Sequence, residues 1–338
     1  MRPSPAPAAP IPVAVVTGFL GSGKTTLIGR VLRDPRYART AVIVNEFGEI
    51  GLDHDLIATG TETLLQLTTG CLCCAVRTDL VDTLLTLDRQ RRDGAIAFDR
   101  VLIETSGLAD PAPILHALMT DPAMAGAFAI ASVVTLVDAL LGAATLRRHP
   151  EARRQVALAD RIVLTKTDLA PVPPELRAVI AGLNATAPVE AGAPPPAALF
   201  AAVPRLPADP VTPAARHSAG ITTALVLRTT PVPALALTLL LEALAEHCGP
   251  RLLRLKGLVD IVEMPGRPAV VHGVQHVFAP VAFLDRWPSD DRRTRIVVIG
   301  ERLPRHFPAR LLDAIAAEVS EAVAAAGADG AGAEPQGQ

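Results

Sequence analysis

The chain has 338 residues, of which half are hydrophobic and only 3% are aromatic, and its formal net charge is −2. That length allows roughly two domains with aliphatic cores. The near-neutral charge gives no basic footprint for nucleic acid or an anionic membrane, and no apolar run approaches the ~20 residues that span a bilayer. We therefore expect neither nucleic acid nor a membrane among its partners.

The cysteines and the first residues of the sequence indicate in which cellular compartment the protein is expected. Of four cysteines, three fall within residues 71–74, and Cys248 stands alone and is expected to pack in a core. This is not the disulfide framework of a small secreted domain. Residues 1–12 contain too many prolines for a signal peptide. We expect a cytoplasmic protein with a flexible leader over residues 1–12.

A phosphate-binding loop follows the first apolar run, which begins at Val13. Residues 18–25, GFLGSGKT, have the Gly-x-x-x-x-Gly-Lys-Thr pattern, and a helical pattern follows them. Glycines let backbone N–H groups turn toward phosphate oxygens, Lys24 reaches the terminal phosphates and Thr25 holds Mg²⁺. A glycine-rich turn that matches by chance is the alternative, but the flanking strand and helix favour a nucleoside triphosphate site.

Two loops after the next strands carry acidic residues. A strand over residues 41–45 precedes the acidic loop 46–55, which stands where P-loop GTPases have a switch that senses the γ-phosphate, although a solvated turn fits equally well. A strand over residues 100–104 ends in Glu104, with Gly107 shortly after it. An acidic residue at that position holds Mg²⁺ through water. A helix then runs to residue 119.

A base-reading element follows two further predicted strands, over residues 129–137 and 161–164. The second strand runs into Thr165-Lys166-Thr167-Asp168. In a Lys-x-Asp element the carboxylate accepts both N–H donors on one edge of guanine, and the lysine stem lies along the base. Lys166 is one of only three lysines in a chain that otherwise uses arginine, so this position is expected to need a compact ammonium. That supports the Lys-x-Asp element and therefore GTP as the nucleotide. Thr165 stands where asparagine is commoner, which leaves one supporting hydrogen bond open.

The thiol cluster Cys71, Cys73 and Cys74 lies between a weak strand over residues 64–67 and a helix over residues 76–92. Three such thiolates can converge on one soft or borderline ion, with a carboxylate, imidazole or exchangeable ligand in the fourth position. Buried packing cysteines or a redox pair are the alternatives. His272 and His276, four apart in strand-like sequence, are expected on one strand face in a surface or packing role rather than as a second metal site.

The order of elements predicts an α/β fold. Alternating strands and helices to about residue 189 indicate a P-loop domain with a mostly parallel sheet, helices on both faces and its ligand at the carboxyl ends of the strands. Later strands over 222–227, 251–262, 269–274, 277–282 and 294–299 and helices over 235–247 and 309–325 predict a smaller α+β domain. The expected divisions are a GTPase domain at 13–190, a Pro/Ala-rich linker at 191–218, a C-terminal domain at 219–326 and a disordered tail at 327–338.

Together the motifs TGFLGSGKTTL, NEFGEIGLD, GCLCC, ETSG and TKTD, in this order, resemble the CobW family of metal-binding P-loop GTPases. The second half resembles the C-terminal domain of that family through RLKG at 254–257, HGVQHVF at 272–278 and DRRTRIVVIG at 291–300. The resemblance extends from about residue 13 to 325. It implies GTP hydrolysis coupled to the handling of Zn²⁺ or Co²⁺ for a client metalloprotein.

The resemblance also implies the site residues. Metal ligands carry over to Cys71, Cys73 and Cys74, and guanine contacts to Lys166 and Asp168. Phosphate and Mg²⁺ contacts map onto Gly21, Ser22, Gly23, Lys24, Thr25 and Thr26, and the catalytic set is Lys24, Thr25 and Glu104. The histidine-rich run of some members is represented here only by His217, which argues against metal storage and leaves the metal open.

The resulting hypothesis is that Mg²⁺-GTP orders the loops 46–55 and 104–110 and brings the thiolates together, and that hydrolysis releases the ion. Glu46 or Glu49 would orient water or add a metal ligand. No in-line arginine or glutamine can be assigned, so slow turnover is expected until a partner binds. A GTP-binding metal sensor with little turnover and a P-loop NTPase with a purely structural zinc site are the alternatives. A homodimer is a possible assembly.

Overall fold

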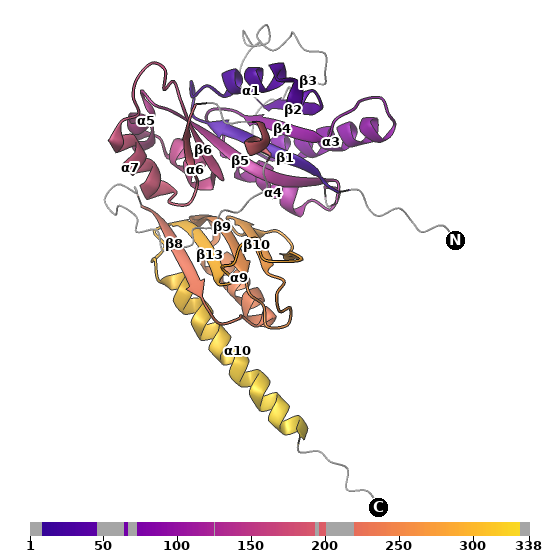
Figure 1. The fold of residues 1–338 in the computed structure, drawn as a ribbon, viewed down its shortest axis with the longest axis vertical. Helices are drawn as coiled ribbons and strands as arrows, with labels where there is room; N and C mark the ends of the chain where they lie inside the picture. The colour runs from indigo at the N-terminus through magenta and orange to yellow at the C-terminus, as the bar shows by residue number, and fades with distance from the viewer. Residues whose placement is uncertain are drawn as a thin grey trace, which may run out of the picture. The chain divides into compact units, whose positions relative to one another are not determined.

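The computed structural model describes residues 9–45, 64–66, 73–124, 126–192, 196–200 and 220–331. The chain divides into two compact units, one containing the described residues up to 200 and the other those from 220 onward (Figure 1). Within these described ranges no helix combines the length and the apolar character that crossing a membrane requires.

A seven-stranded sheet forms the centre of the first unit, and every neighbouring pair in it is parallel. The spatial order is β3-β2-β4-β1-β5-β6-β7. The predicted α/β fold with a mostly parallel sheet is therefore confirmed. The strands are β1 (Ile11–Gly18), β2 (Thr40–Asn45), β3 (Leu64–Gln66), β4 (Arg100–Thr105), β5 (Phe128–Asp138), β6 (Arg161–Thr165) and β7 (Val189–Ala191).

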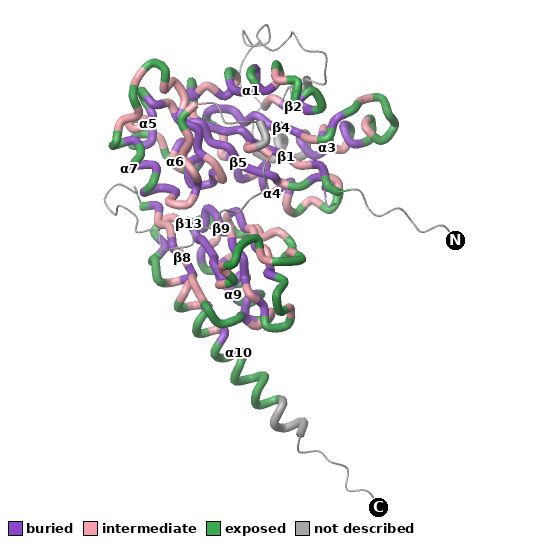
Figure 2. Tube along the Cα trace, in the orientation of Figure 1, coloured by how far each residue is buried: buried purple, intermediate pink, exposed green. Residues whose placement is uncertain are grey.

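Helices cover both faces of this sheet. Val15 and Val16 of β1 point to opposite faces, and both are buried. The central strands of the sheet are coloured as buried in Figure 2. Val16 shares a core with Leu27 and Ile28 of α1, whereas α4 and α6 contact β5. The helices are α1 (Lys24–Arg33), α3 (Cys73–Arg92), α4 (Ala112–Thr120), α5 (Gly142–Arg148), α6 (Pro150–Leu158), α7 (Pro174–Leu183) and α8 (Pro196–Leu199), with a 3-10 turn η1 (Pro35–Tyr37).

The residue boundaries of the first unit differ from the sequence prediction at both ends. Helix α8 lies within the predicted linker 191–218, and its Leu199 is fully buried in the core that contains Val16. Phe200 places its ring centroid 5.9 Å from that of Tyr37. These side chains are apolar enough to pack despite the Pro/Ala-rich surroundings. Strand β1 begins at Ile11, which pairs with Phe128, so the predicted flexible leader is too long by two residues.

An antiparallel sheet with two helices forms the second unit, which confirms the predicted α+β domain. Its order is β11-β10-β9-β13-β8, with β12 paired to β10. Cys248 lies in the core between sheet and helices, as predicted, and burial raises the pKa of its thiol. The elements are β8 (Ile221–Arg228), α9 (Ala234–Cys248), η2 (Gly249–Arg251), β9 (Leu252–Val259), β10 (Ala269–Val274), β11 (Val277–Phe278), β12 (Ala282–Phe283), β13 (Thr294–Glu301) and α10 (Phe307–Ala331).

Three predictions for the second unit were wrong in detail. The single strand expected over 277–282 is two short strands, because Pro280 lacks the N–H that a continuous strand needs. His272 lies in β10 but His276 lies in the turn after it, where Gln275 has a positive φ of 52°, so the two do not share a strand face. Helix α10 continues to Ala331 because its alanine-rich sequence favours helix. The predicted start of a disordered tail at residue 327 is therefore wrong.

The second unit offers a pH test at Asp291. Its carboxylate accepts hydrogen bonds from Arg293 Nε at 3.0 Å and from Arg295 at 3.1 Å. The hydrogen bonds from Arg293, followed by the charge of Arg295, hold the pKa of Asp291 well below its usual value. A lowered carboxyl pKa stabilises the fold above the ordinary value of about 4, and this stabilisation is lost as the pH falls through the folded-state pKa.

We expect Asp291→Asn to lower the free energy of unfolding of this unit by about 1–2 kcal/mol at pH 7, because two charged hydrogen bonds are lost. The difference from wild type should shrink below about pH 4. Urea unfolding of the full chain, followed by the fluorescence of its only tryptophan, Trp287, measures this unit. An equal loss at pH 7 and pH 3 would contradict the assigned ion pairs.

Candidate functional site

The phosphate loop connects β1 to α1 in the middle of the parallel sheet. Gly23 precedes the helix in a left-handed conformation, with φ at 93°, that glycine adopts without strain. Lys24, only 6% exposed, donates from Nζ to the Gly18 carbonyl at 3.0 Å. Because this bond spans the loop, the ammonium is held within the ring of backbone that would surround the phosphates.

The carboxyl end of β4 brings Glu104 to the first turn of α1. Glu104 pairs in register with Val16 of β1 and is 2% exposed. The Thr25 hydroxyl donates to Glu104 Oε1 at 3.4 Å. Thr25 and Glu104 thus place two oxygen ligands beside the phosphate loop. Oxygen ligands of this kind fit the coordination of Mg²⁺, which keeps several of its waters.

The loop after Glu104 lies against the phosphate loop. A Cβ on Gly107 would lie 2.8 Å from the Leu20 nitrogen and 2.9 Å from its Cα, so only glycine allows this approach. The Thr105 hydroxyl donates to the Thr17 hydroxyl at 2.8 Å, which joins the ends of the two strands. The loop after β4 and the phosphate loop are therefore in direct backbone contact.

The predicted base-reading element, residues 165–168, follows β6, which lies on the other side of β1 from β4 in the sheet order. Thr165 donates from its hydroxyl to the Ser22 carbonyl at 2.7 Å, so threonine makes the supporting bond that the sequence left open. Lys166 has a left-handed φ of 57°, and its ammonium lies 2.5 Å from Asp138 Oδ2. Asp168 is exposed. The site residues Ser22, Lys24, Thr25, Glu104, Thr165 and Lys166 therefore all lie at the carboxyl edge of the sheet.

The Thr165 bond makes a direct prediction. Thr165→Val keeps the side-chain shape but leaves the Ser22 carbonyl without its donor, so we expect GTP and GDP affinity to fall equally, by about threefold to tenfold. Thr165→Ser keeps the hydroxyl and should bind near the wild-type level. Equilibrium binding of a fluorescent guanine nucleotide measures both variants. Equal affinities for the valine and serine variants would show that the bond does not support the nucleotide site.

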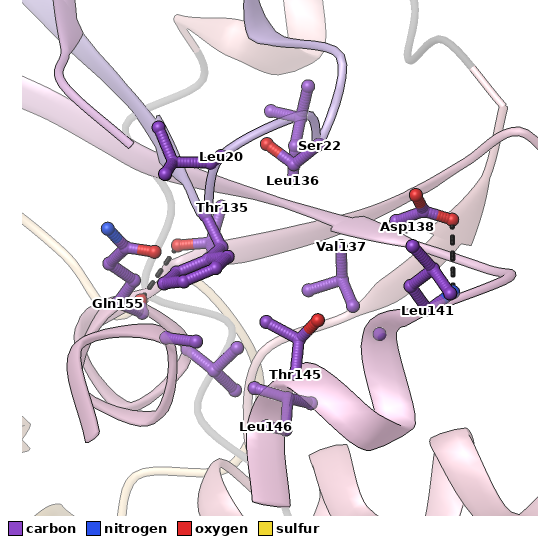
Figure 3. Close-up of a pocket in the computed structure, with 14 residues that line it drawn as sticks. Leu20, Ser22, Thr135, Leu136, Val137, Asp138, Leu141, Thr145, Leu146 and Gln155 are labelled. Atoms are coloured by element: carbon purple, nitrogen blue, oxygen red, sulfur yellow. Dashed lines mark hydrogen bonds between the residues drawn. The ribbon is translucent and has the colours of Figure 1, made fainter. Parts of the chain in front are cut away.

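Sequence reasoning does not single out Asp138 or Gln155. Asp138, at the carboxyl end of β5, accepts from the Leu140 N–H at 2.7 Å as well as from Lys166. The signal that identified Glu104, an acidic residue ending an apolar strand, applies to Asp138 too. Gln155 on α6 lines a cavity of about 160 Å³ beneath the phosphate loop, together with Ser22 (Figure 3). No local pattern marks a glutamine of this kind.

The thiol cluster lies largely outside the described residues. Helix α3 begins at Cys73, three residues before the predicted start, so Cys73 and Cys74 occupy its first turn. Cys71, Glu46 and Glu49 lie outside the described ranges, as do the side chains of Cys73 and Cys74. Among the described residues no group of three or more His, Cys, Asp or Glu side chains could hold a metal ion.

Comparison with known proteins identifies relatives of both units. Residues 12–190 match the model described as CobW/HypB/UreG, nucleotide-binding domain, and residues 221–316 match the cobalamin synthesis protein cobW C-terminal domain. The zinc chaperone YjiA of Escherichia coli is 34% identical over 306 residues, which cover 87% of this chain and 95% of the relative. The zinc chaperone CobW of Pseudomonas aeruginosa is 36% identical over 191 residues, which cover 47% of this chain and 50% of the relative.

A solved structure supports the same relationship. The crystal structure of Zn(II)-bound YjiA GTPase from E. coli has a TM-score of 0.70 and 28% sequence identity, covering 91% of this chain and 99% of that one. The likeness extends over both units, as the two family matches do. The chain therefore belongs to the CobW/HypB/UreG family, and it joins the P-loop nucleotide-binding domain of that family to a CobW C-terminal domain.

Proposed function

We propose that this protein is a Mg²⁺-dependent cytoplasmic GTPase that binds Zn²⁺ or Co²⁺ through Cys71, Cys73 and Cys74 and delivers it to a client metalloprotein. The relatives named as zinc chaperones and the zinc-bound YjiA GTPase support this role. The observation that carries the proposal is topological. Strand β3 ends at the same carboxyl edge of the parallel sheet as the strand before the phosphate loop, and the sequence between β3 and α3 contains Cys71 and leads directly into Cys73 and Cys74 of α3.

The nucleotide half of the proposal rests on buried polar groups. Lys24 would stabilise negative charge on the terminal phosphate, and the loop that holds its ammonium reduces the reorganisation needed during the reaction. Thr25 and Glu104 would hold Mg²⁺, which neutralises phosphate charge when it is bound. Lys166 and Asp168 would bind guanine, with the lysine ammonium held by Asp138. Glu46 or Glu49 would orient the attacking water.

The metal half of the proposal follows from the same edge of the sheet. Cys73 and Cys74 open α3, and the free backbone N–H groups of a helix start favour the negative charge of a thiolate. Binding of the ion displaces the thiol protons, so metal affinity should rise with pH. GTP would order the loops 46–55 and 104–110 and complete the site, and hydrolysis would release the ion to the client.

Base specificity provides the test of the nucleotide half. The Asp168 carboxylate accepts from two N–H groups of guanine, so Asp168→Asn should weaken GTP binding by at least about a hundredfold, since a charged acceptor is lost and an N–H donor takes its place. The amide should instead favour xanthosine triphosphate, which carries an oxygen where guanine has its amino group. Binding of GTP, xanthosine triphosphate and ATP to both proteins measures this. A wild-type chain that binds ATP as tightly as GTP would contradict the proposal and favour an ATPase.

A further inference from the structure

Gln155 joins helix α6 to the loop that follows Glu104. Its side chain is 1% exposed, and its Nε2 donates to the Gly107 carbonyl at 3.2 Å and to the Ala109 carbonyl at 3.0 Å. Its own backbone carbonyl accepts from the Thr135 hydroxyl of β5 at 2.8 Å (Figure 3). One buried amide therefore ties two carbonyls of the loop, those of Gly107 and Ala109, to α6, which is itself bonded to β5.

The loop that Gln155 holds is also the loop pressed against the phosphate loop. Gly107 approaches the Leu20 backbone more closely than any side chain allows, and the Ala109 N–H donates to the Ser106 carbonyl at 3.0 Å. The two hydrogen bonds from Gln155 act on carbonyls, so they set the orientation of the adjacent peptide groups. The orientation of the backbone N–H groups in this loop thus depends on a side chain of α6.

The oxygen of the same amide, Gln155 Oε1, is buried, and Gln155 lines a cavity together with residues of the phosphate loop. Gln155 and Ser22 both line the cavity of about 160 Å³, and neither Gln155 Oε1 nor Ser22 Oγ has a hydrogen-bond partner among the described residues. Val137, Leu146 and Val156 supply apolar walls. Buried polar atoms of this kind are satisfied by ordered water when space allows. Gln155 therefore lies between the cavity under the phosphate loop and the loop after β4.

We infer that Gln155 is a positioning residue for the γ-phosphate: it holds the Gly107 loop where that loop distinguishes GTP from GDP. This inference rests on the proposed GTP-binding function. A glutamine that served only stability would affect GTP and GDP binding alike. A positioning role predicts that the two affinities separate, because GDP lacks the phosphate that the loop would meet.

Two matched variants of the full-length chain separate these roles. Gln155→Met keeps the side-chain length but removes the N–H donors. Asn184→Leu is the control, because Asn184 is another 1% exposed amide that donates to carbonyls at the end of α6, Val156 at 2.9 Å and Ala159 at 2.9 Å. Asn184 has no hydrogen bond to the Gly107 loop among those of the described residues, so it tests the structural cost of losing such an amide.

Equilibrium binding of a non-hydrolysable GTP analogue and of GDP, with thermal unfolding in parallel, gives the result. For Gln155→Met we expect affinity for the analogue to fall about tenfold and affinity for GDP to stay within about twofold. For Asn184→Leu we expect a comparable loss of thermal stability with both affinities unchanged. If Gln155→Met lost affinity for the GTP analogue and for GDP equally, or lost affinity for neither, the inference would be overturned.

A third variant adds a readout that a structural role would not give. In Gln155→Glu the protonated carboxyl can donate to one of the two carbonyls, whereas the ionised form repels both. Affinity for the GTP analogue should therefore fall with rising pH in this variant and not in wild type. A flat profile would contradict the positioning role. A wild-type chain that binds no guanine nucleotide would contradict the proposed function itself, and the inference with it.

Discussion

Replacing Lys24 with methionine is expected to lower the rate of GTP hydrolysis by at least about a hundredfold. The ammonium is buried and is held by the Gly18 carbonyl, so it would stabilise charge on a bound phosphate with little reorganisation. Methionine keeps the length of the stem and removes the charge. Arginine should not restore the rate, because its planar fork does not fit a loop built around a compact ammonium. Steady-state hydrolysis, with phosphate release as the signal, measures the effect.

The matched control for this prediction is Lys256→Met. Lys256 lies on β9 of the second unit and is one of the three lysines of the chain. The same chemical change there should leave the hydrolysis rate of the full chain near the wild-type level. If Lys24→Met hydrolysed GTP as fast as Lys256→Met, the phosphate loop would not be the catalytic site.

Removing one thiol of the cluster should have a comparably large effect on metal binding. Cys73→Ser replaces a soft thiolate by a neutral hydroxyl, which is a poor ligand for Zn²⁺, so we expect zinc affinity to fall by at least about a hundredfold. Far-ultraviolet circular dichroism should stay unchanged, because serine tolerates the start of a helix well. Competition with a zinc-binding dye measures the affinity.

Cys248→Ala is the control for the metal prediction. Cys248 is 4% exposed in the core of the second unit, where it packs rather than binds metal. This variant should lose some stability and keep the full zinc affinity. Equal zinc affinities in Cys73→Ser and wild type would show that the thiol cluster is not the metal site.

Much of the fold could be predicted because buried parallel strands have a simple sequence signature. Strands β1, β2, β4, β5 and β6 are mostly apolar runs, as expected of strands covered on both faces. Polar motifs at their carboxyl ends indicated where the site lies. Helix α8 escaped prediction because Leu199 and Phe200 are too short an apolar signal within a Pro/Ala-rich stretch.

The candidate site was less predictable than the fold because part of it consists of tertiary hydrogen bonds. The Lys166 ammonium pairs with Asp138, 28 positions away, and Gln155 reaches Gly107, 48 positions away. No periodicity relates such residues. Thr165 shows the same limit, since the sequence left its hydrogen bond open and the structure supplies it through the Ser22 carbonyl. The roles of Cys71, Cys73 and Cys74 stay predictions.

The central claim is that the nucleotide controls the metal. A Zn²⁺ titration of the full-length chain in three states, with a non-hydrolysable GTP analogue, with GDP and without nucleotide, tests it most directly. We expect the highest zinc affinity with the GTP analogue and at least about tenfold weaker binding with GDP, as a coupling free energy of about 1.4 kcal/mol between two sites requires. Equal affinities in all three states would contradict coupling and favour a purely structural zinc site.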